Sequence, residues 1–174
     1  MRAPADIRTI ALGVLVPVLA LAAAGVVGAA IWAWWADPPA QSDATRTNAE
    51  LLLGEQFAVD ASYAFTGLAV GLAVGVALAW VLRRTGWLLV VGVTLGGVCA
   101  AAVSYELAQR WGPGPESGIE RAALLSGALV VHIPGVFLSW PVGALAGLLL
   151  VVWLTDRAED LAAEPLLPDL PRGS

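Results

Sequence analysis

The sequence contains no lysine, one cysteine and one histidine, and charged residues fill only 13% of its 174 positions. With Cys99 as the single cysteine, neither an intrachain disulfide nor a cysteine-based metal cluster can form. The net charge of −5 lacks the basic excess that marks proteins binding nucleic acid, so we expect no nucleic-acid partner. These absences argue against a disulfide-stabilised protein, a protein with a cysteine-based metal cluster and a nucleic-acid-binding protein.

Charge is missing above all from four long stretches. Hydrophobic residues make up 59% of the chain, whereas soluble domains have about 45–50%. A hydrocarbon core about 30 Å thick needs roughly 20 consecutive apolar residues in a helix. Each of the uncharged stretches is long enough to cross it: residues 9–36, 61–82, 85–105 and 133–155.

These stretches predict an all-α membrane protein, a four-transmembrane-helix bundle with two short outer loops. The first stretch is too long for a signal-peptide core of about 7–15 residues, and it ends in tryptophans rather than small residues, so we expect a retained helix. We expect the lipid bilayer to surround one domain, residues 1–155, followed by a flexible cytoplasmic tail, residues 156–174. The predicted spans are residues 10–35, 61–82, 86–107 and 135–155.

Arginine and tryptophan positions predict the orientation of the spans. Cytoplasmic loops carry an excess of positive charge, and indole rings prefer the membrane boundary. With the N-terminus inside, most arginines fall on the inner side, including Arg83 and Arg84 in the second turn. We therefore predict a multi-pass protein of the cytoplasmic (inner) membrane with both termini in the cytoplasm. All tryptophans then fall at span ends: Trp32, Trp34, Trp35, Trp111 and Trp140 at the outer boundary, and Trp80, Trp87 and Trp153 at the inner one.

Three local features leave room for interpretation. Residues 50–54 have the composition of one helical turn lying on the membrane surface. Residues 121–134 are apolar and partly β-branched, which favours an extended segment packed on the helix ends, with a re-entrant piece as the alternative. Within the first span, Pro17 is expected to kink the helix.

Small residues recur at every fourth position in the predicted spans. Such a row lies along one side of a helix and lets two backbones approach closely in a bilayer. The rows of the second and third spans are the longest, and we predict that they form the interface between these two spans. The predicted helix-packing glycines are Gly67, Gly71, Gly75, Gly92, Gly96, Gly143 and Gly147.

Few side chains with reactive chemistry remain. Ionisable residues inside a membrane indicate function by default, and the predicted spans have none near their centres. Asp60, Glu106 and His132 fall at the outer boundary. Glu106 precedes Arg110 by four residues, the favourable order for an ion pair on a helix. We predict no catalytic residue, no cofactor and no metal site, and we regard these four side chains as candidate outer-face contacts for a partner.

The leading hypothesis is a non-enzymatic accessory or assembly subunit. It would bind another membrane protein, or further copies of itself, through glycine-lined helix faces and the outer loops. The alternative is a small oligomeric transporter or lipid-handling membrane protein, which requires a cavity between the helices. A membrane-bound enzyme would need Asp60, Glu106 and His132 to converge within about 4–5 Å.

Several segments also carry a family resemblance, among them Arg-Arg-Thr-Gly at residues 83–86 and Gly-Pro-Gly-Pro at residues 112–115. The others are residues 28–38, 56–60, 95–97 and 134–141. Together they resemble an uncharacterised actinobacterial family of multi-pass membrane proteins, a domain of unknown function. That family is similar to an accessory subunit associated with Mce-type lipid-import complexes. The resemblance implies a role beside a lipid importer and no catalytic residue.

Overall fold

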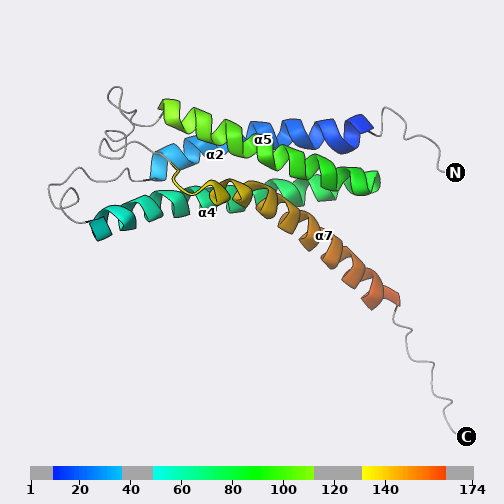
Figure 1. Ribbon diagram of the computed structural model, residues 1–174. Coiled ribbons are helices and arrows are strands. Elements are labelled where there is room, and N and C mark those ends of the chain that lie inside the picture. The colour runs from blue at the N-terminus through cyan, green and yellow to red at the C-terminus, as the bar shows by residue number, and fades with distance from the viewer. Residues whose placement is uncertain (1–9, 37–48, 112–130, 164–174) are drawn as a thin grey trace, which may run out of the picture.

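The computed structural model describes residues 10–36, 49–111 and 131–163. The described part is helical, without a strand, and its helices form an elongated bundle (Figure 1). Three short segments accompany the long helices: the π-helical turn η1 (Ala11–Leu15) and the 3₁₀ segments η2 (Arg83–Thr85) and η3 (Pro134–Leu138). The long helices are α2 (Val16–Trp35), α4 (Ala49–Leu82), α5 (Trp87–Trp111) and α7 (Ser139–Ala163).

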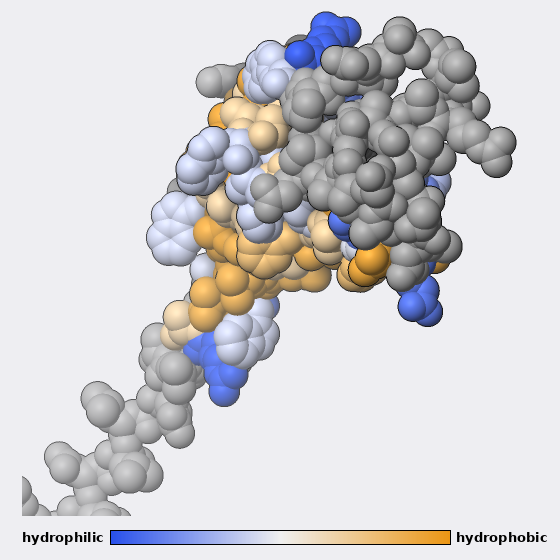
Figure 2. Space-filling view, turned by 90° about the vertical axis from the view of Figure 1, so that its left-hand side faces the viewer, coloured by the Kyte–Doolittle hydropathy of each residue, from blue (hydrophilic) through white to orange (hydrophobic). Residues whose placement is uncertain are grey.

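All four long helices are apolar and long enough to cross a membrane. Their side chains leave much apolar surface uncovered, as at Leu19 and Val81, which are 60% and 76% exposed. Figure 2, which looks along the bundle from its left-hand end in Figure 1, shows hydrophobic residues over much of the described middle and the few strongly hydrophilic ones mostly toward the edges. This confirms the predicted all-α fold and supports a multi-pass membrane protein. The candidate spans have mean hydropathies between 2.0 and 2.5 and cover Ala11–Trp35, Leu53–Leu82, Trp87–Trp111 and Pro134–Ala158.

The helix of the second span is longer than its uncharged stretch. α4 begins at Ala49, so residues 50–54 form its first turns and the prediction of a separate surface turn is wrong. Polar side chains end the contact of a helix with lipid, but they do not end the helix itself. A helix ends where a residue such as proline interrupts its backbone, and α4 contains no proline. Its 34 residues extend about 51 Å, beyond a bilayer core of about 30 Å. α4 is therefore longer than a hydrocarbon core requires.

Glycines join the helices in two tight pairs, α2 with α5 and α4 with α7. A Cβ atom added to Gly25 would lie 2.7 Å from the carbonyl oxygen of Ala100 on α5. A Cβ added to Gly71 would lie 2.7 Å from the carbonyl oxygen of Trp140 on α7. Because real Cβ atoms do not come this close to a backbone, glycine is what allows the two helices of each pair to touch.

The two helices of each pair run in the same direction. Contacts in the first pair advance together along both chains, from Gly13 beside Leu88 to Gly25 beside Ala100. Contacts in the second pair do the same, from Gly67 beside Ser139 to Gly75 beside Ala144. Each pair thus joins helices that are separated in the sequence by one other span.

The prediction that the second and third spans share a glycine-lined interface is wrong. The row on α4 faces α7, the row on α5 faces α2, and α4 and α5 touch each other little. A row of small residues specifies which face of a helix is packed, but not which helix covers it. Gly143 and Gly147 of α7 return the contact, against Leu68 and Leu72 of α4. All seven predicted packing glycines therefore meet another helix of the same chain.

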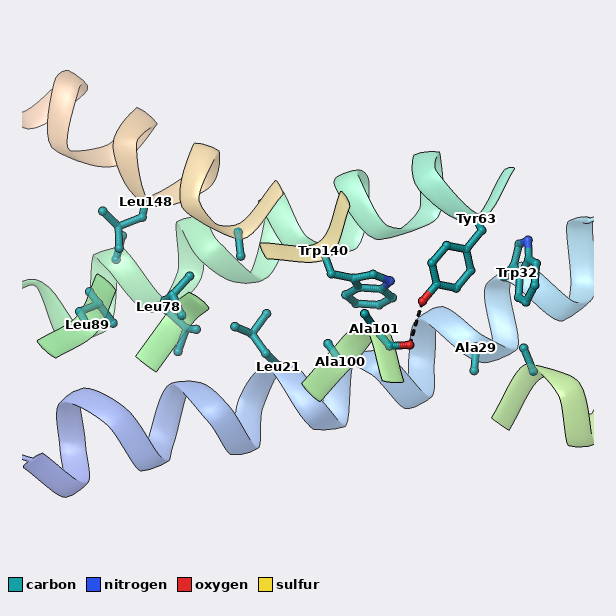
Figure 3. Close-up of a cluster of buried hydrophobic side chains, with 14 of the residues drawn as sticks. Leu21, Ala29, Trp32, Tyr63, Leu78, Leu89, Ala100, Ala101, Trp140 and Leu148 are labelled. Carbon is teal, nitrogen blue, oxygen red and sulfur yellow. Dashed lines mark hydrogen bonds between the residues drawn. The ribbon is translucent and has the colours of Figure 1, made fainter. Parts of the chain in front are cut away.

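Large side chains fill the space between the two pairs, which we call the seam. Trp32, Tyr63 and Trp140 are fully buried there, with Leu21 further along the bundle (Figure 3). Trp32 and Trp140 lie near the ends of their spans, as predicted, but both rings are buried between helices instead of facing the surroundings of the bundle. The other six tryptophans are exposed.

Glycines explain how so large a ring fits at the seam. A Cβ on Gly28 would collide with the indole of Trp140, and a Cβ on Gly67 would lie 2.8 Å from its Cδ1 atom. Glycine rows therefore serve two purposes here. They bring backbones together within a pair, and they leave room for an aromatic ring between pairs.

Pro17 alters its helix through a widened turn. It follows the π-helical turn η1, in which the N–H of Val16 bonds to the carbonyl of Ala11, and α2 continues to Trp35. Such turns accommodate a residue that cannot complete the regular ladder. The proline ring is buried against Gly92 of α5.

α7 leaves the bundle in its second half (Figure 1). Val151 is the last of its described side chains to be buried, and Val152, Trp153 and Leu154 are 45–54% exposed. The helix also continues to Ala163, beyond the predicted end of the span at residue 155. A groove lies where α7 diverges from the ends of α4 and α5.

Candidate functional site

Two polar residues that lie 72 positions apart meet at the bundle end formed by Trp35 and Trp111, called the outer end after the predicted orientation. Asp60 of α4 is 2% exposed, and its Oδ1 accepts a hydrogen bond of 2.9 Å from the backbone N–H of His132. The same oxygen lies 4.0 Å from Nδ1 of His132. A buried carboxylate requires such partners, so this contact fastens the chain before η3 onto α4.

This attachment bears on the segment predicted to be extended or re-entrant. Residues 131–133 have no helical structure, and Ile133 has extended backbone angles, φ −104° and ψ 105°. They lead into η3, which packs against α4, α5 and α7. The described end of the segment is therefore extended, and residues 121–130 lie outside the described part of the chain.

His132 does not have the surroundings of a metal ligand in the described structure. Its side chain is 25% exposed, yet both ring nitrogens are buried and accept or donate no hydrogen bond within residues 10–36, 49–111 and 131–163. Metal sites in proteins use three or four ligating side chains. The described residues contain no group of three His, Cys, Asp or Glu that could hold an ion. Asp60 and His132 alone are too few ligands to hold a metal ion.

The other two candidate contacts, Glu106 and Arg110, lie exposed on α5. The predicted ion pair between them is not formed, because Glu106 and Arg110, both within the described part of the chain, make no ion pair with each other. Glu106 borders a lateral groove of about 330 Å³ between α5 and η3. The groove is otherwise apolar and is lined also by Val98, Ala101, Ala102, Tyr105, Phe137 and Leu138.

The three residues of the enzyme hypothesis do not form one cluster. Asp60 and His132 come together inside the outer end, whereas Glu106 is exposed on the lateral surface of α5. No hydrogen bond or ion pair in the described chain joins Glu106 to either of them. The arrangement offers a buried carboxylate for holding the backbone rather than a proton donor and acceptor facing a substrate.

The sequence did not predict the aromatic cluster at the seam, in which the hydroxyl of Tyr63 forms a buried hydrogen bond. Tyr63 of α4 donates a hydrogen bond of 2.8 Å to the carbonyl of Ala101 on α5 (Figure 3). Its ring stacks edge-on against Trp32, with ring centroids 4.9 Å apart, and against Phe137, 5.5 Å apart. Tyr63 lies four residues before Gly67, in the same row as the glycines. That spacing was the signal for an inward-facing tyrosine.

Further hydrogen bonds cross from α2 to α4 near the outer end. The indole of Trp32 donates to the hydroxyl of Ser62 at 2.9 Å, and that of Trp35 donates to Thr66 at 3.1 Å. Both hydroxyls also bond to carbonyls of their own helix. These bonds tie the two helix pairs together near the outer end.

A second lateral groove lies at the opposite end, near η2, which we call the inner end. It has a volume of about 250 Å³ and lies between α4, α5 and the diverging half of α7. Arg83 is the charged residue in its lining, and Thr155 is a polar one.

Compared with models of protein families, with curated proteins and with solved structures, the chain has no match.

Proposed function

We propose that the chain is a non-enzymatic accessory or assembly subunit of a larger complex in the cytoplasmic membrane. The polar side chains at its outer end and its seam support this proposal, because they hold helices together instead of facing an open reaction site. The centre of the bundle supports it as well. Trp32, Trp140 and Leu21 fill that space, so a small transporter would have to form its path between copies of the chain.

The surface that binds the partner differs from the one suggested by the glycine rows. The seven packing glycines are covered by helices of the same chain, and Asp60 is buried. Glu106 and Arg110 are the two candidate contacts that stay exposed. We therefore place the docking surface at the groove between α5 and η3.

One observation carries this choice: the Glu106 carboxylate borders an apolar groove and forms no ion pair within the described chain. A carboxylate at a membrane boundary gains most from a cation that approaches through the low-dielectric region. We expect the partner to present a helix with small or apolar side chains and one arginine or lysine. Phe137 and Leu138 of η3 supply the opposite wall of the groove.

Co-purification from native membranes tests this docking surface. Tagged protein extracted in mild detergent should retain the partner, identified by mass spectrometry, and Ala102→Phe should remove most of it by filling the groove. Glu106→Gln should weaken retention about tenfold, as expected when one side of a partly buried charge pair is lost. Ala23→Phe, at another exposed alanine on α2, and Asp156→Asn serve as matched controls that should retain the partner.

The docking proposal fails if wild-type protein is repeatedly recovered alone under gentle extraction. It also fails if Ala23→Phe and Ala102→Phe lose the partner equally. The family resemblance directs the search toward an Mce-type lipid-import complex, and the subunits of such an importer are the proteins to look for in the co-purified material.

A further inference from the structure

The inner groove combines an apolar floor with an open, aromatic entrance. Ala79, Leu89, Leu148 and Val151 form the floor and are at most 9% exposed. Trp80 and Trp87 are among the wall residues and are 63% and 69% exposed. Indole rings prefer the headgroup level of a bilayer, which places the entrance there and the floor toward the hydrocarbon. The remaining wall residues include Val90 on α5 and Val152 on α7.

Arg83 gives the groove one positive charge at this entrance. Its guanidinium lies 5.9 Å from the centre of the Trp80 ring and forms no ion pair in the described chain. The sequence adds Arg84 to the same turn. On α7, Asp156 and Arg157 have opposite charges, and Arg157 stacks on Trp153 instead of entering the groove. Among the residues that line the groove, Arg83 is therefore the one that carries a charge, and that charge is positive.

We propose that the inner groove binds one anionic phospholipid, with an acyl chain on the apolar floor and the phosphate beside Arg83. A guanidinium matches a phosphate in charge and in hydrogen-bond geometry. Basic pockets between membrane helices at headgroup level bind lipids of this kind. The proposal needs η2 to lie at the headgroups, on either side of the membrane, and it is independent of the proposed function.

The chemistry of the lining favours a lipid over a peptide. A peptide brings backbone groups that need hydrogen-bond partners. The Thr155 hydroxyl already donates to carbonyls of its own helix, at Val151 and Val152. The groove therefore offers apolar contact plus one cation, which matches a hydrocarbon chain that ends in an anion.

Competition between two lipids with identical acyl chains tests the proposal. The purified full-length protein is given equal amounts of phosphatidylglycerol and phosphatidylcholine, and bound lipid is counted by native mass spectrometry. We expect the wild type to retain phosphatidylglycerol preferentially. Arg83→Gln should reduce the preference about fivefold, the effect of one arginine near a lipid surface. Val152→Trp should lower the retention of both lipids by filling the groove.

Matched variants separate a specific site from general attraction. Arg110→Gln removes an exposed arginine from the opposite end of α5, and Val142→Trp enlarges an exposed valine of α7 outside the groove. Both should bind lipid as the wild type does. Circular dichroism confirms that each variant remains helical. An unchanged preference in Arg83→Gln, an equal loss in Arg110→Gln, or full retention in Val152→Trp would overturn the proposal.

Discussion

The interface within each helix pair and the seam between the pairs are built by opposite means. Within a pair, glycine brings backbone against backbone, as where Gly147 meets the carbonyl of Leu72. At the seam, aromatic rings and hydrogen bonds hold the helices, as where Tyr63 reaches the carbonyl of Ala101. In lipid, apolar side chains gain little from leaving the solvent, so contact area and hydrogen bonds decide association. The chain relies on contact area within the pairs and adds hydrogen bonds between them.

The difference between the pair interfaces and the seam has one exception. A Cβ added to Gly97 would lie 2.6 Å from the Cα atom of Pro141, so α5 and α7 also approach closely at one point of the seam. This point lies next to Trp140, whose ring occupies the space that separates the pairs elsewhere. The seam therefore has one point of close backbone approach beside its bulky filling, whereas glycines provide close approach at several points of each pair interface.

The largest effect should come from breaking a pair interface. Gly71→Leu places a side chain against the backbone of Trp140 and Ala144, which cannot move aside, and should lower the free energy of unfolding by about 3 kcal/mol. Gly54→Leu is the matched control on the same helix, because a Cβ at Gly54 meets nothing within 4 Å. It should not destabilise the protein, and its higher helix propensity should raise the free energy of unfolding by up to about 0.8 kcal/mol. Reversible unfolding in mixed micelles measures both, and equal effects would refute this account of the pairs.

An intermediate effect is expected at the outer end. Asp60→Ala leaves the partly buried N–H of His132 without its acceptor, at a cost of about 1–2 kcal/mol. Asp60→Asn keeps an oxygen that can accept this bond and should cost clearly less. Hydrogen exchange at the His132 amide gives a local measurement, and we expect it to accelerate in the alanine variant. If both variants exchange like the wild type, Asp60 does not hold this segment.

The smallest effect should come from one hydrogen bond across the seam. Tyr63→Phe removes the bond to Ala101 but keeps the ring contacts with Trp32 and Phe137. Hydrogen bonds between membrane helices contribute about 0.6 kcal/mol on average, and we expect a loss of this size. Thr94→Val is the control, since that hydroxyl bonds only within its own helix, to Val90. A larger loss for Thr94→Val would contradict the ranking.

The sequence predicted the number and nature of the helices because lipid imposes a long uncharged run on each span. It also predicted that glycines such as Gly71 and Gly92 lie on packed faces, since a spacing of four keeps them on one side. Their partners could not be predicted. The pattern on α4 is equally compatible with α5 and α7, and the choice depends on shapes such as the Trp140 ring opposite Gly67.

The candidate site was predicted in part. Asp60 and His132 were singled out, but their direct contact joins distant segments, which no local spacing reveals. The expected bond between Glu106 and Arg110 follows a local rule, yet exposed pairs of this kind gain little free energy and need not form. The inner groove depends on the direction that α7 takes after Val151, which a uniformly apolar sequence does not determine.

The parallel pairing has a consequence for how the chain matures during synthesis. Spans enter the membrane one after another, but α2 finds its close neighbour only when α5, the third span, has been inserted. α4 waits in the same way, with its glycine face open to lipid until α7, the fourth span, has been inserted. If synthesis stopped before Ser139, the glycine face of α4 would stay uncovered. An exposed packing surface of this kind is what the quality control of membrane proteins would recognise.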